Sequence, residues 1–228
     1  MSPPATPLTA PGTVPPGCII TRWQAALDHL PLVAILRGLT PDEAVPIGQA
    51  LAAAGFRLIE VPLNSPQPFV SIARLRQALP SEVLVGAGTV RRADELQVLA
   101  STGAELAVSP HADLTLVRMA CALGLVSVPG VLTPTEALAA LDAGAHALKL
   151  FPAELMPPVG VQALRAVLPP TTPLLPVGSV TPERMAVYRQ VGAAGFGLGS
   201  ALYAPGRSVA EVTERAAAFV AAWRKPPA

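Results

Sequence analysis

Short apolar segments rich in valine, isoleucine and leucine alternate with longer amphipathic segments from residue 31 to near the C-terminus. The apolar segments are typical of strands buried on both faces, and amphipathic segments of about ten to fifteen residues are typical of helices. The pattern therefore predicts eight strands, at residues 32–38, 57–63, 83–89, 105–110, 125–131, 147–152, 173–179 and 195–200. A further amphipathic segment at residues 21–30 predicts an extra helix before the first strand.

Helix starts fit between these strands. Three Thr-Pro dipeptides, which begin at residues 40, 133 and 181, each supply a threonine as N-cap and a proline as first helical residue. Strands that alternate with helices imply a parallel sheet, and eight such units in about 200 residues predict a (β/α)8 TIM barrel with an extra N-terminal helix. A doubly wound open sheet is the alternative, but the segment ILRGLTPDEA after the first strand is not the glycine-rich fingerprint which that fold predicts.

Length and composition fit one domain. The chain has 228 residues, 51% of them hydrophobic, and we expect a single domain at residues 19–225 after a flexible, proline-rich tail at residues 1–18. The tail lacks the basic start and apolar segment of a secretory signal, and no apolar run is long enough for a membrane span. A net charge of +1 argues against nucleic acid as a partner. The two cysteines show no metal-ligand spacing, so we expect a reducing, cytoplasmic location.

One lysine, Lys149, interrupts the apolar strand predicted at residues 147–152. The chain has 14 arginines and only two lysines, and the other lysine, Lys225, lies within the last four residues. Arginine would serve a structural ion pair at least as well, whereas a buried lysine loses its proton and becomes an amine that forms Schiff bases with carbonyl compounds. An ion pair or a side chain that extends to water is the alternative explanation. Lys149 is therefore the first catalytic candidate.

Glu60 interrupts the second predicted strand in the same way. A carboxyl group among apolar residues has a raised pKa and can transfer protons. The alternative is a structural ion pair with Arg37 or Lys149. Together with Lys149, Glu60 would supply the acid/base partner that imine formation and carbon–carbon cleavage require.

Candidate anion-binding residues stand at the ends of other predicted strands, where the active sites of barrels lie. Glycines that end the last two strands allow backbone N–H groups to approach a phosphate, and an arginine after the first strand can bind a carboxylate or phosphate. These candidates are Arg37, Thr89, Gly178, Ser179, Gly199 and Ser200. Each of the glycine motifs alone also fits an ordinary turn, and Thr89 also fits a helix cap.

No metal site is expected, because the histidines at positions 29, 111 and 146 are scattered and no carboxylates cluster at the strand ends. His111, just past the fourth strand, is the best placed of the three, but we interpret it as a loop residue. No organic cofactor is expected either.

Several motifs together resemble a known family. The segments AILRG, IEVPLNSPQP, VGAGTV, LKLFPAE, VTPE and GLGSALY occur in this order, and they resemble the KDPG/KDPGal aldolase family over about residues 20–224. PLNSP after Glu60 is similar to the galactonate branch, since the gluconate branch usually carries an arginine where Asn64 stands. The resemblance implies a homotrimeric, cofactor-free class I aldolase that cleaves a phosphorylated six-carbon keto-acid to pyruvate and D-glyceraldehyde 3-phosphate.

The resemblance also implies roles for individual residues. Lys149 matches the Schiff-base lysine and Glu60 the general acid/base, while Arg37 and Thr89 match residues around the carboxylate of the pyruvate part. The further substrate-binding residues expected are Asn64, Pro110, Phe151, Gly178, Ser179, Gly199 and Ser200.

The chain departs from the family pattern at two positions of the site. Ser179 stands where the family usually has a second glycine, and a positive φ there would strain a serine while still presenting its backbone N–H. His111 stands where the family often has asparagine or another small polar residue.

Three alternative functions remain open at this point. One is main or additional activity on the gluconate epimer, because Asn64 favours galactonate without deciding between the two. Another is a different phosphate-dependent barrel enzyme, such as an isomerase or decarboxylase, which would not need the amine of Lys149. The third is a non-catalytic phosphosugar-binding barrel.

Overall fold

The computed structural model describes residues 18–226, so all but the last residue of the tail predicted at residues 1–18 lies outside the described part. Its strands are β1 (Leu32–Ile35), β2 (Leu58–Pro62), β3 (Leu84–Gly88), β4 (Leu106–Val108), β5 (Val126–Val128), β6 (Gly130–Val131), β7 (Leu148–Leu150), β8 (Leu174–Pro176) and β9 (Phe196–Leu198). Its α-helices are α1 (Ile19–His29), α2 (Pro41–Ala53), α3 (Pro68–Ala78), α4 (Ala93–Ser101), α5 (Leu114–Ala122), α6 (Pro134–Asp142), α7 (Pro158–Arg165), α8 (Pro182–Gln190) and α9 (Val209–Arg224). A 3-10 turn, η1 (Ala153–Leu155), follows β7.

Each of the eight predicted strand segments contains a strand. The segment at residues 125–131 contains two, because Pro129 has no N–H and interrupts the hydrogen-bond ladder between β5 and β6. The three helices predicted from Thr-Pro dipeptides begin at the expected prolines, as the start residues of α2, α6 and α8 show. At the first of them, the Thr40 N–H donates to Glu43 Oε2 at 3.0 Å, which satisfies a free donor at the helix start.

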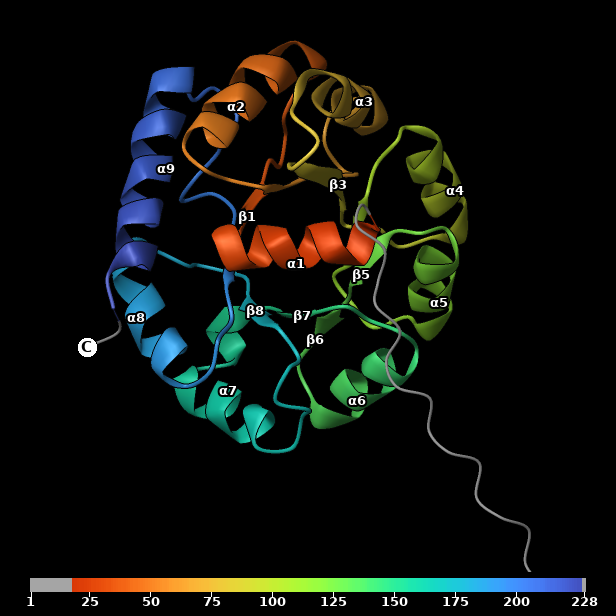
Figure 1. Cartoon of the computed structure of the whole chain (residues 1–228), viewed down its shortest axis with the longest axis vertical. Helices are drawn as coiled ribbons and strands as arrows, with labels where there is room; N and C mark the ends of the chain where they lie inside the picture. Colours follow the sequence, from red (N-terminus) through yellow and green to blue (C-terminus); the bar gives the residue numbers. More distant parts are fainter. Residues whose placement is uncertain (1–17, 227–228) are drawn as a thin grey trace, which may run out of the picture.

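The strands form a curled parallel array. Six of them pair in the order β5-β4-β3-β2-β1-β9 and three in the order β6-β7-β8, all parallel. An isolated parallel bridge joins Val177, just past β8, to Gly197 of β9. Helices α2 to α9 surround the strands, as Figure 1 shows. The fold is thus α/β with a curled parallel sheet whose strand ends converge on one side.

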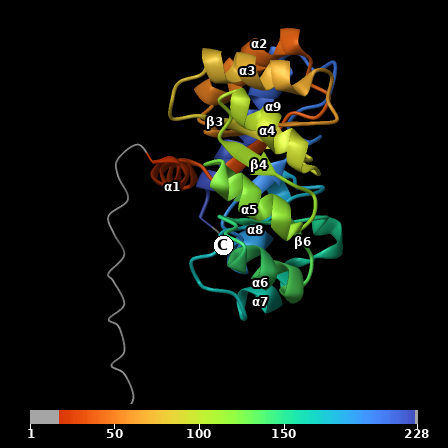
Figure 2. The same ribbon diagram turned by 90° about the vertical axis from the view of Figure 1, so that its right-hand side faces the viewer.

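The predicted N-terminal helix is present as α1, and it closes one end of this array. Trp23, Ala26 and Leu27 of α1 are buried in one apolar cluster with residues near the starts of the strands, such as Leu58 and Val126. Figure 2 shows α1 on one side of the body that the other elements form. Because α1 covers the ends where the strands begin, the opposite ends are left for a site.

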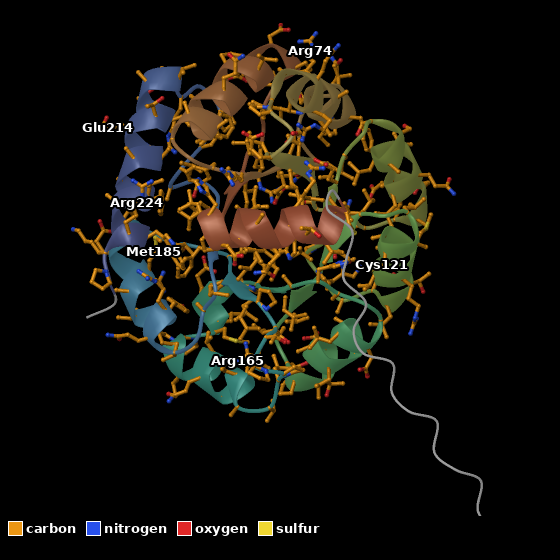
Figure 3. The ribbon with its side chains drawn as sticks, in the orientation of Figure 1. Arg74, Cys121, Arg165, Met185, Glu214 and Arg224 are labelled. Atoms are coloured by element: carbon orange, nitrogen blue, oxygen red, sulfur yellow. The ribbon has the colours of Figure 1, made fainter. Side chains whose placement is uncertain are left out.

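A second apolar cluster fills the space between the strands and the surrounding helices. It includes Phe56, Phe196 and Phe219, each almost fully buried. Figure 3 shows side chains packed through the centre, whereas the labelled Arg74 and Glu214 lie on the outer ring of helices. Within residues 18–226, no helix combines the length and the apolar character that a membrane span needs.

Candidate active site

Lys149 is the central residue of β7 and is only 5% exposed. Leu148 and Leu150 on either side pack toward the helices, so the alternation of a strand turns Lys149 to the inside of the array. Its Nζ atom lies 4.6 Å from the centroid of the Phe151 ring. Burial lowers the pKa of Lys149, the carboxyl of Glu60 raises it in part, and the charge of Arg37 lowers it further.

Glu60, in β2, is 1% exposed and faces the same interior. Burial raises its pKa to about 7, although the positive charges of Lys149 and Arg37 lower it in part. Its Oε2 atom is buried and has no hydrogen-bond partner within the described part of the chain. A carboxyl group with this pKa holds a proton in a large share of molecules at neutral pH and releases it in the rest, which suits both acid and base roles.

Gly88, at the end of β3, makes room for this carboxyl group. A Cβ atom on Gly88 would overlap both oxygens of Glu60, so no side chain larger than hydrogen fits there without displacing the carboxylate. Gly88 is a site residue that was not predicted from the sequence. The neighbouring Thr89 was predicted as a site residue. The VGAGTV segment at the strand end contains both residues, so it could also have indicated Gly88.

A cavity of about 560 Å³ opens above Lys149 at the ends of β1, β7, β8 and β9, a size suited to a small substrate. It brings together seven of the predicted residues, namely Arg37, Lys149, Phe151, Gly178, Ser179, Gly199 and Ser200. Six further lining residues were not predicted, namely Ile35, Val177, Val180, Thr181, Ala201 and Arg207. A smaller cavity of about 20 Å³ is lined by Lys149, Glu60 and mostly apolar side chains, and it has room for roughly one water molecule.

Arg37 is held by residues from two neighbouring strand ends. Its Nη1 donates to Asn64 Oδ1 at 2.6 Å, and its Nη2 lies 3.5 Å from Thr89 Oγ1. Thr89 adopts a left-handed backbone with φ of 57°. The N–H of Gly38 donates to Ser65 Oγ at 2.9 Å, which fixes the loop that carries Arg37. The three predicted residues Arg37, Asn64 and Thr89 thus form one hydrogen-bonded group.

The loop after β8 shows the strain that the sequence predicted for Ser179. Ser179 has a φ of 45°, in the left-handed region, and Gly178 has a φ of 125°. The Ser179 hydroxyl donates to a carboxylate oxygen of Glu154, and this bond lowers the pKa of Glu154. Arg184 Nη1 donates to the Ser179 carbonyl at 2.8 Å. Glu154, which sequence analysis did not select, therefore helps to hold this loop.

Pro110, which was predicted to bind substrate, lies apart from this cavity, and so does His111, which was interpreted as a loop residue. Pro110 is half-buried and packs against Gly130, and His111 is exposed in the loop between β4 and α5. Neither is among the residues that line the larger cavity. Within residues 18–226, no three histidine, cysteine, aspartate or glutamate side chains stand close enough together to hold a metal ion.

Comparison with known proteins identifies the family. A family model described as "Aldolase: KDPG and KHG aldolase" matches residues 24–215. The protein named "2-dehydro-3-deoxy-6-phosphogalactonate aldolase" in Escherichia coli K12 is 46% identical over 204 residues, which cover 90% of this chain and 98% of that protein. The chain therefore belongs to the KDPG/KHG aldolase family.

Two further relatives and a solved structure show which members of the family the chain is more similar to. A Rhizobium meliloti protein named "Probable 2-dehydro-3-deoxy-6-phosphogalactonate aldolase" is 48% identical over 193 residues, covering 85% of this chain and 91% of the relative. A solved structure titled "Native KDPGal structure" superposes with a TM-score of 0.84 and 47% identity, covering 86% of this chain and 95% of that chain. The Escherichia coli K12 "KHG/KDPG aldolase" is more distant, with 32% identity over 173 residues, 73% of this chain and 80% of the relative.

Proposed function

We propose that the chain is a class I aldolase that cleaves 2-dehydro-3-deoxy-6-phospho-D-galactonate to pyruvate and D-glyceraldehyde 3-phosphate. The observation that carries the proposal is the burial of Lys149, which lines the larger cavity, together with Glu60, which lines the smaller cavity that Lys149 also borders. Burial lowers the pKa of the amine, and it raises that of the carboxyl group to about 7. A neutral amine beside a proton-transferring carboxyl group is what imine chemistry needs.

The proposed reaction begins when the neutral amine of Lys149 attacks the C2 ketone. Glu60 carries protons through a carbinolamine, which loses water to give the protonated imine. Glu60, through a water molecule, then removes the proton of the C4 hydroxyl, the aldehyde forms, and the electron pair of the C3–C4 bond moves into the imine. The resulting enamine takes a proton at C3, and hydrolysis releases pyruvate and restores Lys149.

The remaining predicted residues are assigned to binding. Arg37, with Asn64 and Thr89, would bind the carboxylate of the pyruvate part, since a guanidinium suits planar carboxylates. The ring of Phe151 would flank the imine, and we keep Pro110 as a substrate-binding residue that a bound substrate would have to reach. Backbone N–H groups at Gly178, Ser179, Gly199 and Ser200 would bind the phosphate.

We also propose that the two sheets form one closed (β/α)8 barrel within a single domain at residues 19–225. Pro129 alone separates β5 from β6, and the bridge between Val177 and Gly197 joins β8 to β9, so the two sheets meet at both edges. The homotrimer and the cytoplasmic location stay predictions from the family resemblance and the cysteine content.

The galactonate epimer is favoured by two observations. Relatives named for the galactonate substrate are 46% and 48% identical to this chain, against 32% for the relative named "KHG/KDPG aldolase". Asn64 also accepts a hydrogen bond from Arg37 at the position where the gluconate branch usually carries its own arginine. Main or additional activity on the gluconate epimer is the alternative, and the ratio of kcat/KM for the two epimers decides it.

Trapping with borohydride tests the amine directly. The protein is incubated with pyruvate, reduced, weighed intact by mass spectrometry and then mapped by peptides. We expect a mass gain that localises to Lys149. A folded protein without an adduct at Lys149 would overturn the aldolase mechanism and leave a phosphosugar-binding barrel, or another phosphate-dependent enzyme, as the explanation of the site.

A further inference from the structure

We infer that Arg207 is a phosphate-binding residue of this site, whose guanidinium binds the 6-phosphate of the substrate; the inference rests on the proposed function. Arg207 lies in the loop between β9 and α9 and lines the larger cavity. The same wall contains the glycine and serine residues whose backbone N–H groups we assign to the phosphate. Arg207 and these glycine and serine residues therefore line one cavity.

Arg207 is held in place by a backbone contact. Its Nη1 donates to the carbonyl oxygen of Ser200 at 2.6 Å, which ties the side chain to one of the phosphate-binding loops. That bond uses one of five guanidinium N–H donors. The side chain is half-buried, so a fixed and partly desolvated guanidinium can bind an anion with little loss of conformational freedom.

Arg207 forms no ion pair within 4.0 Å with a carboxylate of the described residues, 18–226. Glu211 is near enough for Arg207 to lower its pKa, but Glu211 Oε2 already accepts bonds from the N–H and the hydroxyl of Ser208, both at 2.8 Å. The positive charge of Arg207 thus remains available to a ligand.

A negative charge near the loop at Gly178 and Ser179 makes a cation favourable for phosphate binding there. Glu154 beside Ser179 carries a lowered pKa and is therefore charged near neutral pH, so it repels a phosphate dianion. Arg184 acts electrostatically on Glu154 but is not among the lining residues of the cavity. Arg207 is the lining cation on this side, and its charge offsets the repulsion.

The two arginines that line the cavity lean in opposite directions along the array. Arg37, after β1, reaches toward Asn64 and Thr89, which follow β2 and β3. Arg207 reaches the loop after β9, which pairs with the other edge of β1. A substrate with a carboxylate at one end and a phosphate at the other could direct one charged group toward each arginine.

The test compares Arg207→Gln and Arg207→Lys with a matched control, Arg215→Gln. Arg215 of α9 is exposed and donates to the carbonyl of Ala201 in the same loop at 3.1 Å, but it does not line the larger cavity. The control thus removes the same charge and the same kind of loop contact. Figure 3 shows the adjacent Glu214 on the outer side of the ring.

Three quantities are measured for each variant: the Kd for inorganic phosphate, the KM and kcat for the phosphorylated substrate, and borohydride trapping with pyruvate, which has no phosphate. For Arg207→Gln we expect KM for the phosphorylated substrate and Kd for phosphate to rise about tenfold to a hundredfold, as for other charge-assisted bonds. Trapping with pyruvate should stay unchanged, and Arg207→Lys should recover part of the affinity.

Two results would overturn the inference. If Arg207→Gln binds phosphate as tightly as Arg215→Gln does, the guanidinium is not a phosphate ligand. If it weakens pyruvate trapping and lowers the melting temperature while Arg207→Lys recovers nothing, its role is structural. Absence of trapping in the native chain would instead reject the aldolase mechanism, and the phosphate titration would still decide whether Arg207 binds the anion.

Discussion

The two ends of the cavity are built differently. At the base, which we define as Lys149 and the smaller cavity that it shares with Glu60, both residues are placed by strands and are almost fully buried. At the phosphate side, Ser179 and Ser200 are exposed on loops, and Arg207 is half-buried. Desolvation shifts the pKa values of the first pair, whereas screening by water weakens each charge of the second group. The base is thus suited to chemistry and the loops to affinity.

This difference predicts where substitutions are tolerated. A change at the base alters the protonation of Lys149 or Glu60. No neighbouring side chain can take over the proton transfer of Glu60, because its Oε2 atom has no hydrogen-bond partner within the described residues. A change at the loops can be offset locally, as Glu154 does for the strained Ser179. Substitutions should therefore lower kcat at one end and raise KM at the other.

The largest expected effect comes from Lys149→Arg. Arginine keeps a positive charge but cannot lose its proton to attack a ketone, so turnover should fall by at least about a thousandfold. The matched control is Lys225→Arg at the end of α9, which changes the other lysine of the chain and should leave kcat unchanged. Steady-state kinetics measure both variants, and near-native turnover of Lys149→Arg would contradict the imine mechanism.

Glu60→Gln should lower kcat by about a hundredfold to ten-thousandfold, the usual range for a general acid/base. In the native chain, kcat/KM should rise as pH increases through about 7, because the carboxylate that accepts the C4 hydroxyl proton forms there. The variant should lose this rise. Glu214→Gln on the exposed face of α9 is the control, and a native-like pH profile in Glu60→Gln would remove Glu60 from the mechanism.

The same carboxyl group predicts a pH dependence of stability. Its pKa is about 7 in the folded chain against an ordinary 4.5, so between these pH values the folded state holds a proton that the unfolded state has lost. The free energy of unfolding from this group is highest below pH 4.5 and declines as pH rises through 7, by about 3 kcal/mol at most. Denaturant titrations at pH 5 and 8 should show a smaller decline in Glu60→Gln.

The residues at the base were predicted from the sequence more completely than the residues of the loops. A charged residue inside an apolar strand is visible in one dimension, which is why Lys149 and Glu60 could be selected and their strands located. Gly88 and Glu154 act through partners 28 and 25 residues away in the sequence, Glu60 and Ser179, and no local pattern signals such a contact. The interruption between β5 and β6 at Pro129 and the position of Arg207 beside the cavity also depend on how the strands curl, which the sequence pattern does not show.

Gly88→Ala should disturb the base although it replaces neither Lys149 nor Glu60. The new methyl group would overlap the carboxylate of Glu60, so we expect a loss of about 1–3 kcal/mol of stability and a fall in kcat. Gly86→Ala, two residues earlier in β3, is the control, because its methyl group would meet the backbone of Leu106 instead. Equal kcat per folded molecule in the two variants would show that Gly88 serves packing alone.

The smallest expected effect concerns Glu154 and Ser179. It tests whether the bond from Ser179 to Glu154 offsets the backbone strain at Ser179. The left-handed backbone of Ser179 is strained for a serine, and the bond to Glu154 offsets that strain. Glu154→Gln weakens the bond and also removes a charge that repels the phosphate; we expect the loss of positioning to exceed this gain, so KM for the phosphorylated substrate should rise a few-fold, within the range of about 1 kcal/mol for an exposed charged contact. Ser179→Gly relieves the strain and should leave KM near its native value.

The double variant separates positioning from charge. If Glu154 acts only by holding Ser179, Glu154→Gln should have no effect on KM in the Ser179→Gly background, because glycine adopts φ near 45° without help. If KM instead falls in that background, the carboxylate of Glu154 mainly repels the phosphate, and the bond to Ser179 serves to restrain that charge. An equal rise of KM in both backgrounds would contradict the coupling, since Glu154 would then act on the substrate independently of Ser179.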